Sequence, residues 1–297
     1  MMTIKWKELI GFLFLVFIAG AGWMFIPSQS AFISLWFSIG YRFLLAGTIL
    51  LVVAGLMNKP LIDRKVFPLI LLQGLIFFPV NYFLTYTACS YLTSGLVALI
   101  ASMTLLPSVI LSLVSKAIHF SYRLIFFVAL AIMGSLLVFY DTLMTSPAHR
   151  WGTMFAILGI MATAMGLWIL PKIKAKTSLS IFSVTGWSMV IGGLSALTIG
   201  YLTVGHFEFS THPTYLRSLA ILCLVTPIFF SGHYYFSIHY SPVTASLVFI
   251  YAPVISMIMS VLFESYVLTW TDVLGTFCVI YAGTQLAITL ARKESAA

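Results

Sequence analysis

The run that decides the fold lies at residues 32–57 and reads FISLWFSIGYRFLLAGTILLVVAGLM. It holds one charged side chain, Arg42, and it exceeds the ~20 apolar residues that a helix needs to cross the hydrocarbon core of a bilayer. Lipid offers no partner to backbone polar groups, so such a run is predicted to be a transmembrane helix.

The composition of the whole chain indicates the same class. Of 297 residues, 61% are hydrophobic and 7% are charged, and the mean hydropathy is +1.10. A soluble domain of this size needs far more surface charge, so that class is excluded. The net charge is +8, but Lys and Arg are spread thinly between apolar runs, which argues against a nucleic-acid partner. The expected partners are the lipid bilayer and a small-molecule substrate.

Ten apolar runs follow one another along the chain. They lie near residues 8–26, 32–57, 67–88, 94–115, 123–141, 153–170, 181–205, 217–239, 243–263 and 268–290. Short dividers that are polar or contain Pro separate them, among them residues 27–30 and 142–151. The sequence therefore predicts an all-α integral membrane protein with ten transmembrane helices.

The basic residues predict the orientation. With the N-terminus inside, only Arg150 and Arg217 of the 15 Lys and Arg residues fall in outer loops, and Arg42 lies within a span. The cytoplasmic loops of membrane proteins carry an excess of Lys and Arg. We therefore expect a multi-pass protein of the inner (plasma) membrane with both termini cytoplasmic, and with the loops around Thr145 and Ser210 outside.

The two halves of the chain carry similar motifs at matching positions. Asn81 and Pro107 in the first half correspond to His233 and Pro253 in the second. Each half holds five spans, an odd number, so the second half must be inverted relative to the first. Inverted repeats are a transporter architecture with the substrate site near the midplane, at the repeat interface. The expected repeats are residues 1–145 and 146–297.

Several short motifs are distributed over nearly the whole chain. They are Gly20-Ala21-Gly22-Trp23, Tyr41-Arg42-Phe43-Leu44-Leu45-Ala46, Asn81-Tyr82 with Tyr86-Thr87-Ala88, Pro107, Pro253, Leu262-Phe263-Glu264, Gly275 and Ala282-Gly283. Together they resemble the drug/metabolite transporter superfamily, in particular its EamA-like ten-helix family. The resemblance implies a secondary transporter rather than an enzyme. One departure is that the first half lacks a Glu at residues 113–116, so a mechanism based on paired acidic helix ends is in doubt.

Arg42 lies about ten residues into its helix, too deep for its side chain to reach the membrane surface easily. A central Arg costs roughly 2.5–3.5 kcal/mol on insertion scales. Two interpretations explain what offsets this cost. Helix-end carbonyls and polar neighbours could hold the guanidinium in a structural clamp, or a substrate carboxylate could bind it.

Polar and aromatic side chains define a candidate cavity. Gln73, Phe77, Asn81 and Thr85 recur every four residues and are predicted to share one stripe of a helix, as are His233 and Ser237. The Trp residues add flat apolar surface, or belong to interface belts. The candidate substrate-binding residues are Trp23, Arg42, Gln73, Asn81, Tyr82, Trp168, His233 and Ser237. Pro107 and Pro253 are predicted to break their helices, either for gating or as plain bends.

No Asp or Glu is predicted well inside a span, so a carboxylate relay for protons is not visible. His206, Glu208 and His212 could chelate a metal in an outer loop, but solvated loop residues are the preferred interpretation. The Cys residues have no paired spacing that would indicate a disulfide or a zinc site. Neither a catalytic residue, a metal nor a cofactor is predicted, and no phosphate-binding motif supports ATP-driven transport.

The leading hypothesis is a secondary transporter that exports amino acids or similar small metabolites by alternating access. The alternative is an uptake carrier of the same fold for a nucleotide-derived or cofactor-like metabolite. An embedded enzyme would need a nucleophile and a base, and no third group orients the pair His233 and Ser237. A lining with few polar groups suits a neutral or zwitterionic solute with an apolar body better than a polyanion. The assembly is expected to be a monomer or a homodimer.

Overall fold

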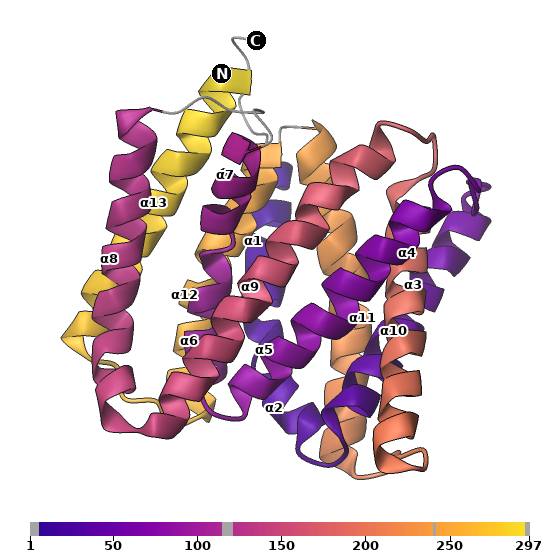
Figure 1. Cartoon of the computed structure of the whole chain (residues 1–297), viewed down its shortest axis with the longest axis horizontal. Helices are drawn as coiled ribbons and strands as arrows, with labels where there is room; N and C mark the ends of the chain where they lie inside the picture. Colours follow the sequence, from indigo (N-terminus) through magenta and orange to yellow (C-terminus); the bar gives the residue numbers. More distant parts are fainter. Residues whose placement is uncertain (1–5, 115–120, 240–241, 295–297) are drawn as a thin grey trace. The chain divides into compact units, whose positions relative to one another are not determined.

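The computed structural model describes residues 6–114, 121–239 and 242–294, and its elements in these ranges are all helices (Figure 1). One of them, η1, is a π-helix. In chain order they are α1 (Trp6–Gly22), α2 (Phe25–Ser30), α3 (Leu35–Leu56), α4 (Phe67–Leu75), η1 (Ile76–Val80), α5 (Asn81–Cys89), α6 (Ser94–Ser102), α7 (Leu105–Val114), α8 (Tyr122–Thr145), α9 (Pro147–Lys174), α10 (Ile181–Val204), α11 (Pro213–His239), α12 (Pro242–Phe263) and α13 (Trp270–Glu294).

Within the described residues, 6 helical segments are long and apolar enough to cross a membrane. They are Trp6–Ser30, Leu35–Leu56, Phe67–Cys89, Pro147–Lys174, Ile181–Val204 and Pro213–His233. Two shorter apolar helices lie at Tyr122–Val138 and Leu247–Phe263. The all-helical class predicted from the sequence is confirmed, and the apolar helices are those of a membrane protein. The number of ten spans stays a prediction.

One of the predicted dividers is wrong, and another is shorter than predicted. Residues 27–30 are helical, because Pro27 lies in the first turn of α2, where a missing N–H breaks no intrahelical bond. In the divider 142–151, α8 ends at Thr145 and α9 begins at Pro147, so that only Ser146 separates the two helices. Proline is favoured at the first helical position, because its φ angle is already that of a helix.

The chain forms two compact units, and each unit takes residues from both halves of the sequence. Unit 1 consists of Met1–Met24, Ala88–Ile157 and Gly232–Ala297. Unit 2 consists of Phe25–Thr87 and Leu158–Ser231. The repeats expected at residues 1–145 and 146–297 stay a prediction.

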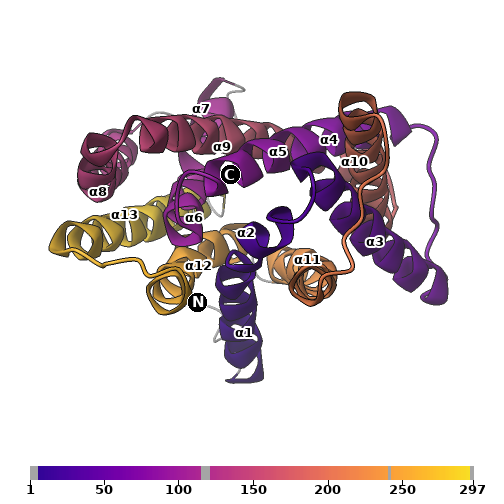
Figure 2. The same cartoon turned by 90° about the horizontal axis from the view of Figure 1, so that it is seen from below.

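In unit 2, α3 and α10 lie side by side in close contact (Figures 1 and 2). A Cβ atom on Gly47 would lie 2.7 Å from the carbonyl oxygen of Gly186, and one on Gly193 would lie 2.5 Å from the backbone nitrogen of Leu44. Small residues at such contacts let the backbones of membrane helices approach closely. The α3–α10 pair is therefore a firm support for the side chains that α3 carries.

The segment α4–η1–α5 also belongs to unit 2 up to Thr87, and its middle is irregular. The π-helix η1 contains Pro79, which has no N–H to give to the helix ladder. The ladder resumes when the N–H of Asn81 donates to the carbonyl of Ile76, five residues back. Such π-bulges are frequent at functional sites.

In unit 1, the predicted interruption near Pro107 is observed. The N–H groups of Met103 and Thr104 bond only three residues back, and α7 begins at Leu105 with Pro107 in its first turn. The proline ring would clash with the carbonyl of Met103 in an unbroken helix. The break expected at Pro253 is wrong, because α12 continues through that residue. Membrane helices tolerate a proline where the freed carbonyl finds another partner or the helix bends.

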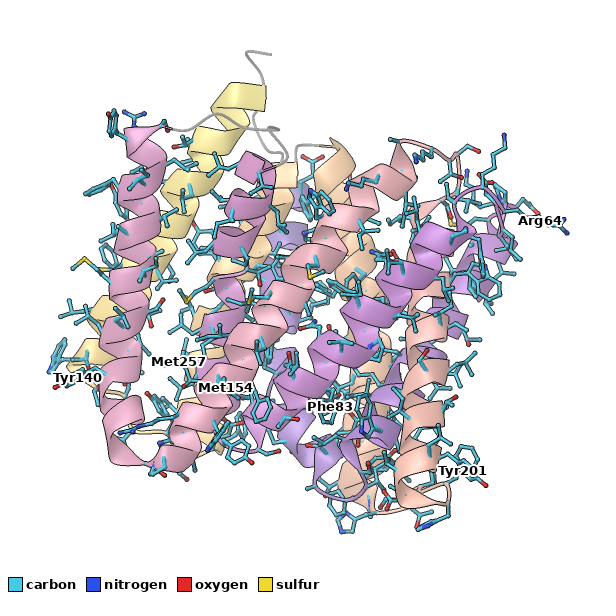
Figure 3. The ribbon with its side chains drawn as sticks, viewed as in Figure 1. Arg64, Phe83, Tyr140, Met154, Tyr201 and Met257 are labelled. Carbon is cyan, nitrogen blue, oxygen red and sulfur yellow. The ribbon has the colours of Figure 1, made fainter. Side chains whose placement is uncertain are left out.

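Hydrogen bonds join connections at the ends of unit 2. The hydroxyl of Thr177 donates to Asp63 Oδ2 at 2.7 Å, and this bond lowers the pKa of the Asp63 carboxyl below its ordinary value. The N–H of Ser34 donates to Glu208 Oε2 at 2.6 Å. Arg64 and Tyr201 lie at opposite ends of this unit (Figure 3). The connections that follow α3 and α9 therefore share one end of the unit.

Candidate functional site

Arg42 lies in the middle of α3 and is 6% exposed. Among the described residues it is the only buried Lys or Arg. Its Nε and Nη2 atoms donate to Thr226 Oγ1 at 3.1 and 3.0 Å, and its Nη1 atom donates to the Tyr86 hydroxyl at 3.1 Å. These acceptors are side-chain hydroxyls, which are the polar neighbours that the clamp interpretation allows, and none of these three bonds goes to a backbone oxygen.

The polar contacts continue beyond Arg42. The hydroxyl of Tyr86 donates to Gln29 Oε1 at 2.7 Å, and Gln29 Nε2 donates to the carbonyl of Ser38 at 2.8 Å. We call Arg42, Thr226, Tyr86 and Gln29 the Arg42 network; its members come from α3, α11, α5 and α2. Gln29 and Thr226 are not candidates from sequence. The signal that could have found them is a polar residue in or beside an apolar run.

Aromatic rings line one side of the guanidinium. The Arg42 Cζ atom lies 5.1 Å from the ring centre of Phe43 and 5.2 Å from that of Tyr82. The ring centres of Phe43 and Phe78 are 4.8 Å apart, and those of Phe78 and Phe230 are 6.0 Å apart. Tyr82 and Phe230 are only half-buried. We call Phe43, Phe78, Tyr82 and Phe230 the aromatic wall.

The polar residues Gln73 and Asn81, predicted to share one stripe of a helix, contact two different neighbouring helices. Gln73 Oε1 accepts a bond of 2.7 Å from the Ser188 hydroxyl of α10. Asn81 Oδ1 accepts from the Thr85 hydroxyl at 3.3 Å, and Gly159 of α9 faces both residues. The π-helix between Gln73 and Asn81 shifts the helical period, so the two amides contact different helices although both are buried.

Three candidates, Trp23, His233 and Ser237, belong to unit 1. The ring of His233 is 5.1 Å from that of Phe249, measured between centres. Trp23 is in the turn after α1, where its N–H donates to the carbonyl of Gly20 at 3.3 Å. Ser237 lies in α11, but its side chain is outside the described part of the structure.

Trp168 has a different environment from the other candidates of unit 2. It is 39% exposed, and the Lys172 Nζ atom lies 2.8 Å from the centre of its ring. A Trp paired with a Lys near a helix end is typical of the membrane interface. Of the candidates, the structure therefore brings Arg42 and Tyr82 into contact and gives Gln73, Asn81 and Trp168 separate partners in the same unit.

The loop of His206, Glu208 and His212, which is predicted to lie outside and whose side chains could chelate a metal, makes other contacts. Glu208 accepts from the Ser34 N–H, and the ring of His212 stacks on Phe32 with 4.4 Å between centres. In the described part of the chain, no group of three or more His, Cys, Asp or Glu residues could hold a metal ion.

Comparisons with known proteins agree with this picture. The family model for the EamA-like transporter family matches residues 150–287. No curated protein sequence matches this chain. A protein of known crystal structure has the same fold with a TM-score of 0.67 and 14% sequence identity, over 97% of this chain and 100% of that one. Residues 150–287 are therefore similar to the EamA-like transporter family, in agreement with the resemblance that the short motifs of the chain carry.

Proposed function

We propose that the protein is a secondary transporter that exports amino acids or similar small metabolites across the inner membrane. It works by alternating access between two inverted five-helix repeats, residues 1–145 and 146–297. The match of residues 150–287 to the EamA-like family model supports the transport role. The observation that carries the proposal is the interruption of two apolar segments, at η1 in unit 2 and between α6 and α7 in unit 1.

Interrupted helices matter because lipid cannot satisfy free backbone groups. Irregular backbone at membrane depth is tolerated where it is buried in protein or lines a cavity. Discontinuous membrane helices form the substrate sites of many transporters. Both interruptions in this chain, η1 and the junction of α6 and α7, lie in the first half of the sequence. The break beside Pro107 is proposed to serve gating.

Contacts between connections support the proposed orientation with both termini cytoplasmic. In unit 2, the bond between Asp63 and Thr177 joins two connections that the basic residues assign to the cytoplasm. In unit 1, the N–H of Ser94 donates to Glu264 Oε2 at 2.9 Å, and this bond joins two connections assigned to the outside. Ten spans of alternating direction account for both pairings.

The residues proposed to line the substrate path include two amides, a histidine, a serine, aromatic rings and one cation. They are Trp23, Arg42, Gln73, Asn81, Tyr82, Trp168, His233 and Ser237. Such a lining has few polar groups, which is typical of sites for a small solute with an apolar body.

Transport into inside-out membrane vesicles tests the proposal. Vesicles from cells with and without the protein are given a panel of labelled amino acids and nucleotides. We expect one or more amino acids to accumulate only in vesicles that contain the protein. Accumulation confined to right-side-out vesicles would show an uptake carrier instead, and no protein-dependent accumulation of any solute in either vesicle type would refute the transport proposal.

A further inference from the structure

The positive charge of Arg42 has no carboxylate partner among the described residues. Its hydrogen bonds go to the neutral hydroxyls of Thr226 and Tyr86. Asp272 is the only acidic side chain in the buried set of the described chain, and it lies in unit 1 with bonds to Thr269. A buried charge without a counterion is costly. The aromatic wall offsets part of this cost through cation–π contacts.

The guanidinium also keeps free donors. It has five N–H groups, and the Arg42 network uses one on each of the three nitrogens. One N–H therefore remains on each terminal nitrogen. A guanidinium, which is a planar fork of N–H groups, can bind the two oxygens of a carboxylate through one N–H on each of two nitrogens. The hydroxyls of Thr226 and Tyr86 hold the fork in one orientation, which lowers the cost of ordering it when an anion binds.

The surroundings of the fork specify the rest of the ligand. The aromatic wall meets the guanidinium at Phe43 and Tyr82, and its members Tyr82 and Phe230 are only half-buried. Flat apolar surface of this kind packs against an apolar or aromatic body. No second buried Lys or Arg is present in the described chain, so one anionic group is matched and a polyphosphate is not.

We propose that Arg42 binds the single carboxylate of the transported solute, with Thr226 and Tyr86 as positioning residues and the aromatic wall as the surface for its apolar body. The substrate class is small monocarboxylates with an apolar or aromatic side group, amino acids included. This inference rests on the proposed transport function and narrows its substrate.

The first test compares ligands that differ at the carboxylate. Purified protein in detergent is heated with L-phenylalanine, 3-phenylpropanoate or L-phenylalaninamide, and the melting temperature is recorded. Ligands that bind the folded state raise this temperature. We expect both carboxylates to raise it and to bind about tenfold or more tightly than the amide. Equal stabilisation by the amide, or none by either carboxylate, overturns the inference and leaves the transport proposal to its own vesicle assay.

The second test uses matched variants. Thr226→Val removes the acceptor that holds two nitrogens of Arg42, whereas Thr203→Val removes an exposed hydroxyl of α10 that bonds only its own helix. We expect Thr226→Val to reduce the carboxylate-to-amide affinity ratio about tenfold and Thr203→Val to keep it. A purely structural role of the network predicts a lower melting temperature with an unchanged ratio, and that result contradicts the proposal. Arg42→Lys, where it folds, should abolish the discrimination, because an ammonium lacks the fork.

Discussion

At the scale of single residues, Arg42 and Glu264 show two ways of keeping a charge in an apolar chain. The carboxylate of Glu264 accepts from the N–H of Ser94 at 2.9 Å and from the hydroxyl of Ser260 at 2.6 Å. Ser94 is the first residue of α6, so the positive end of a helix neutralises the carboxylate locally. Arg42 is held by neutral hydroxyls and rings, and its charge stays available to a ligand.

Asn81 and His233 are the two polar candidates whose truncation tests the substrate path most directly. We expect Asn81→Ala and His233→Ala each to lower the transport rate about tenfold, which corresponds to the loss of about 1.4 kcal/mol of hydrogen bonding in the transport cycle. Transport is measured in vesicles with the solute found there, and membrane levels are measured by immunoblotting. Both variants should reach the membrane at normal levels.

His206→Ala is the matched control for His233→Ala, because His206 is exposed in an outer loop. Thr48→Ala removes an exposed hydroxyl bonded only to the Leu44 carbonyl of its own helix, and it controls for loss of a polar group. Wild-type rates in both Asn81→Ala and His233→Ala would mean that neither residue lies on the path.

The sequence predicts those features of the Arg42 network that depend on neighbouring residues in the chain, and it does not predict contacts between distant residues. The depth of Arg42 follows from its place in one apolar run. Its partners do not, because Tyr86 is 44 and Thr226 is 184 positions away in the chain. Periodicity along one helix carries no information on which other helix it meets, so packing alone reveals these contacts.

At the scale of helices, the α3–α10 pair depends on the absence of side chains at its contact. A Cβ atom on Gly47 would lie 2.7 Å from the Gly186 oxygen and 2.8 Å from the Met189 Cβ, which is too close for either backbone to remain in place. We expect Gly47→Ala to lower the free energy of unfolding by about 1–3 kcal/mol, as overpacking does. Thermal unfolding in detergent measures the change.

Gly55→Ala in the same helix is the control, because nothing lies within 4 Å of a Cβ at Gly55. Alanine there should be neutral or should stabilise α3 by up to ~1 kcal/mol through its higher helix propensity. Equal melting temperatures for Gly47→Ala and Gly55→Ala would contradict the close packing of α3 against α10.

A second prediction at the scale of helices concerns the contact between the start of α6 and the end of α12. The Glu264 carboxylate and the Ser260 hydroxyl of α12 together bind the N–H groups of Ser94 and Gly95, which begin α6. Glu264→Gln should destabilise unit 1 by about 1–2 kcal/mol, because bonds to an ionised acceptor are roughly twice as strong as neutral ones. SDS titration in mixed micelles gives the free energy of unfolding.

A double-mutant cycle with Ser260→Ala tests whether the two side chains act together. Because they share one hydrogen bond and one helix end, we expect a coupling energy of about 0.5 kcal/mol or more. Additive effects of Glu264→Gln and Ser260→Ala would show that they hold α6 independently.

Prolines illustrate what the sequence predicts of the helices and what it does not. Pro107 marks a break and Pro253 does not, although both lie inside apolar runs. Pro79 produces a π-helix that no periodicity predicts. A proline removes the same hydrogen bond in each case, and the surrounding helices decide whether the backbone breaks, bulges or bends. The positions of irregularity are therefore predictable, and their form is not.

At the scale of the whole molecule, connections that share an end of one unit must lie on the same side of the membrane. In unit 2, Asp63 with Thr177 forms one such pair, and Ser34 with Glu208 forms another at the opposite end. In unit 1, the bond between Ser94 and Glu264 defines a third. These pairings come from packing alone, and the distribution of Lys and Arg assigns each of them to one side without conflict.

Topology mapping with single cysteines tests that assignment for the full chain. In a background with Cys89, Cys223 and Cys278 replaced, we expect an impermeant thiol reagent applied to intact cells to label Ser210→Cys and Ala148→Cys. It should not label Lys174→Cys until the cells are opened, because the basic connection after α9 and both termini are predicted to be cytoplasmic. An odd number of spans would reverse the C-terminal half and expose Lys174→Cys. Labelling of that variant from outside would therefore rule out ten spans in two inverted repeats, whereas the expected pattern is the one that ten spans with both termini inside produce.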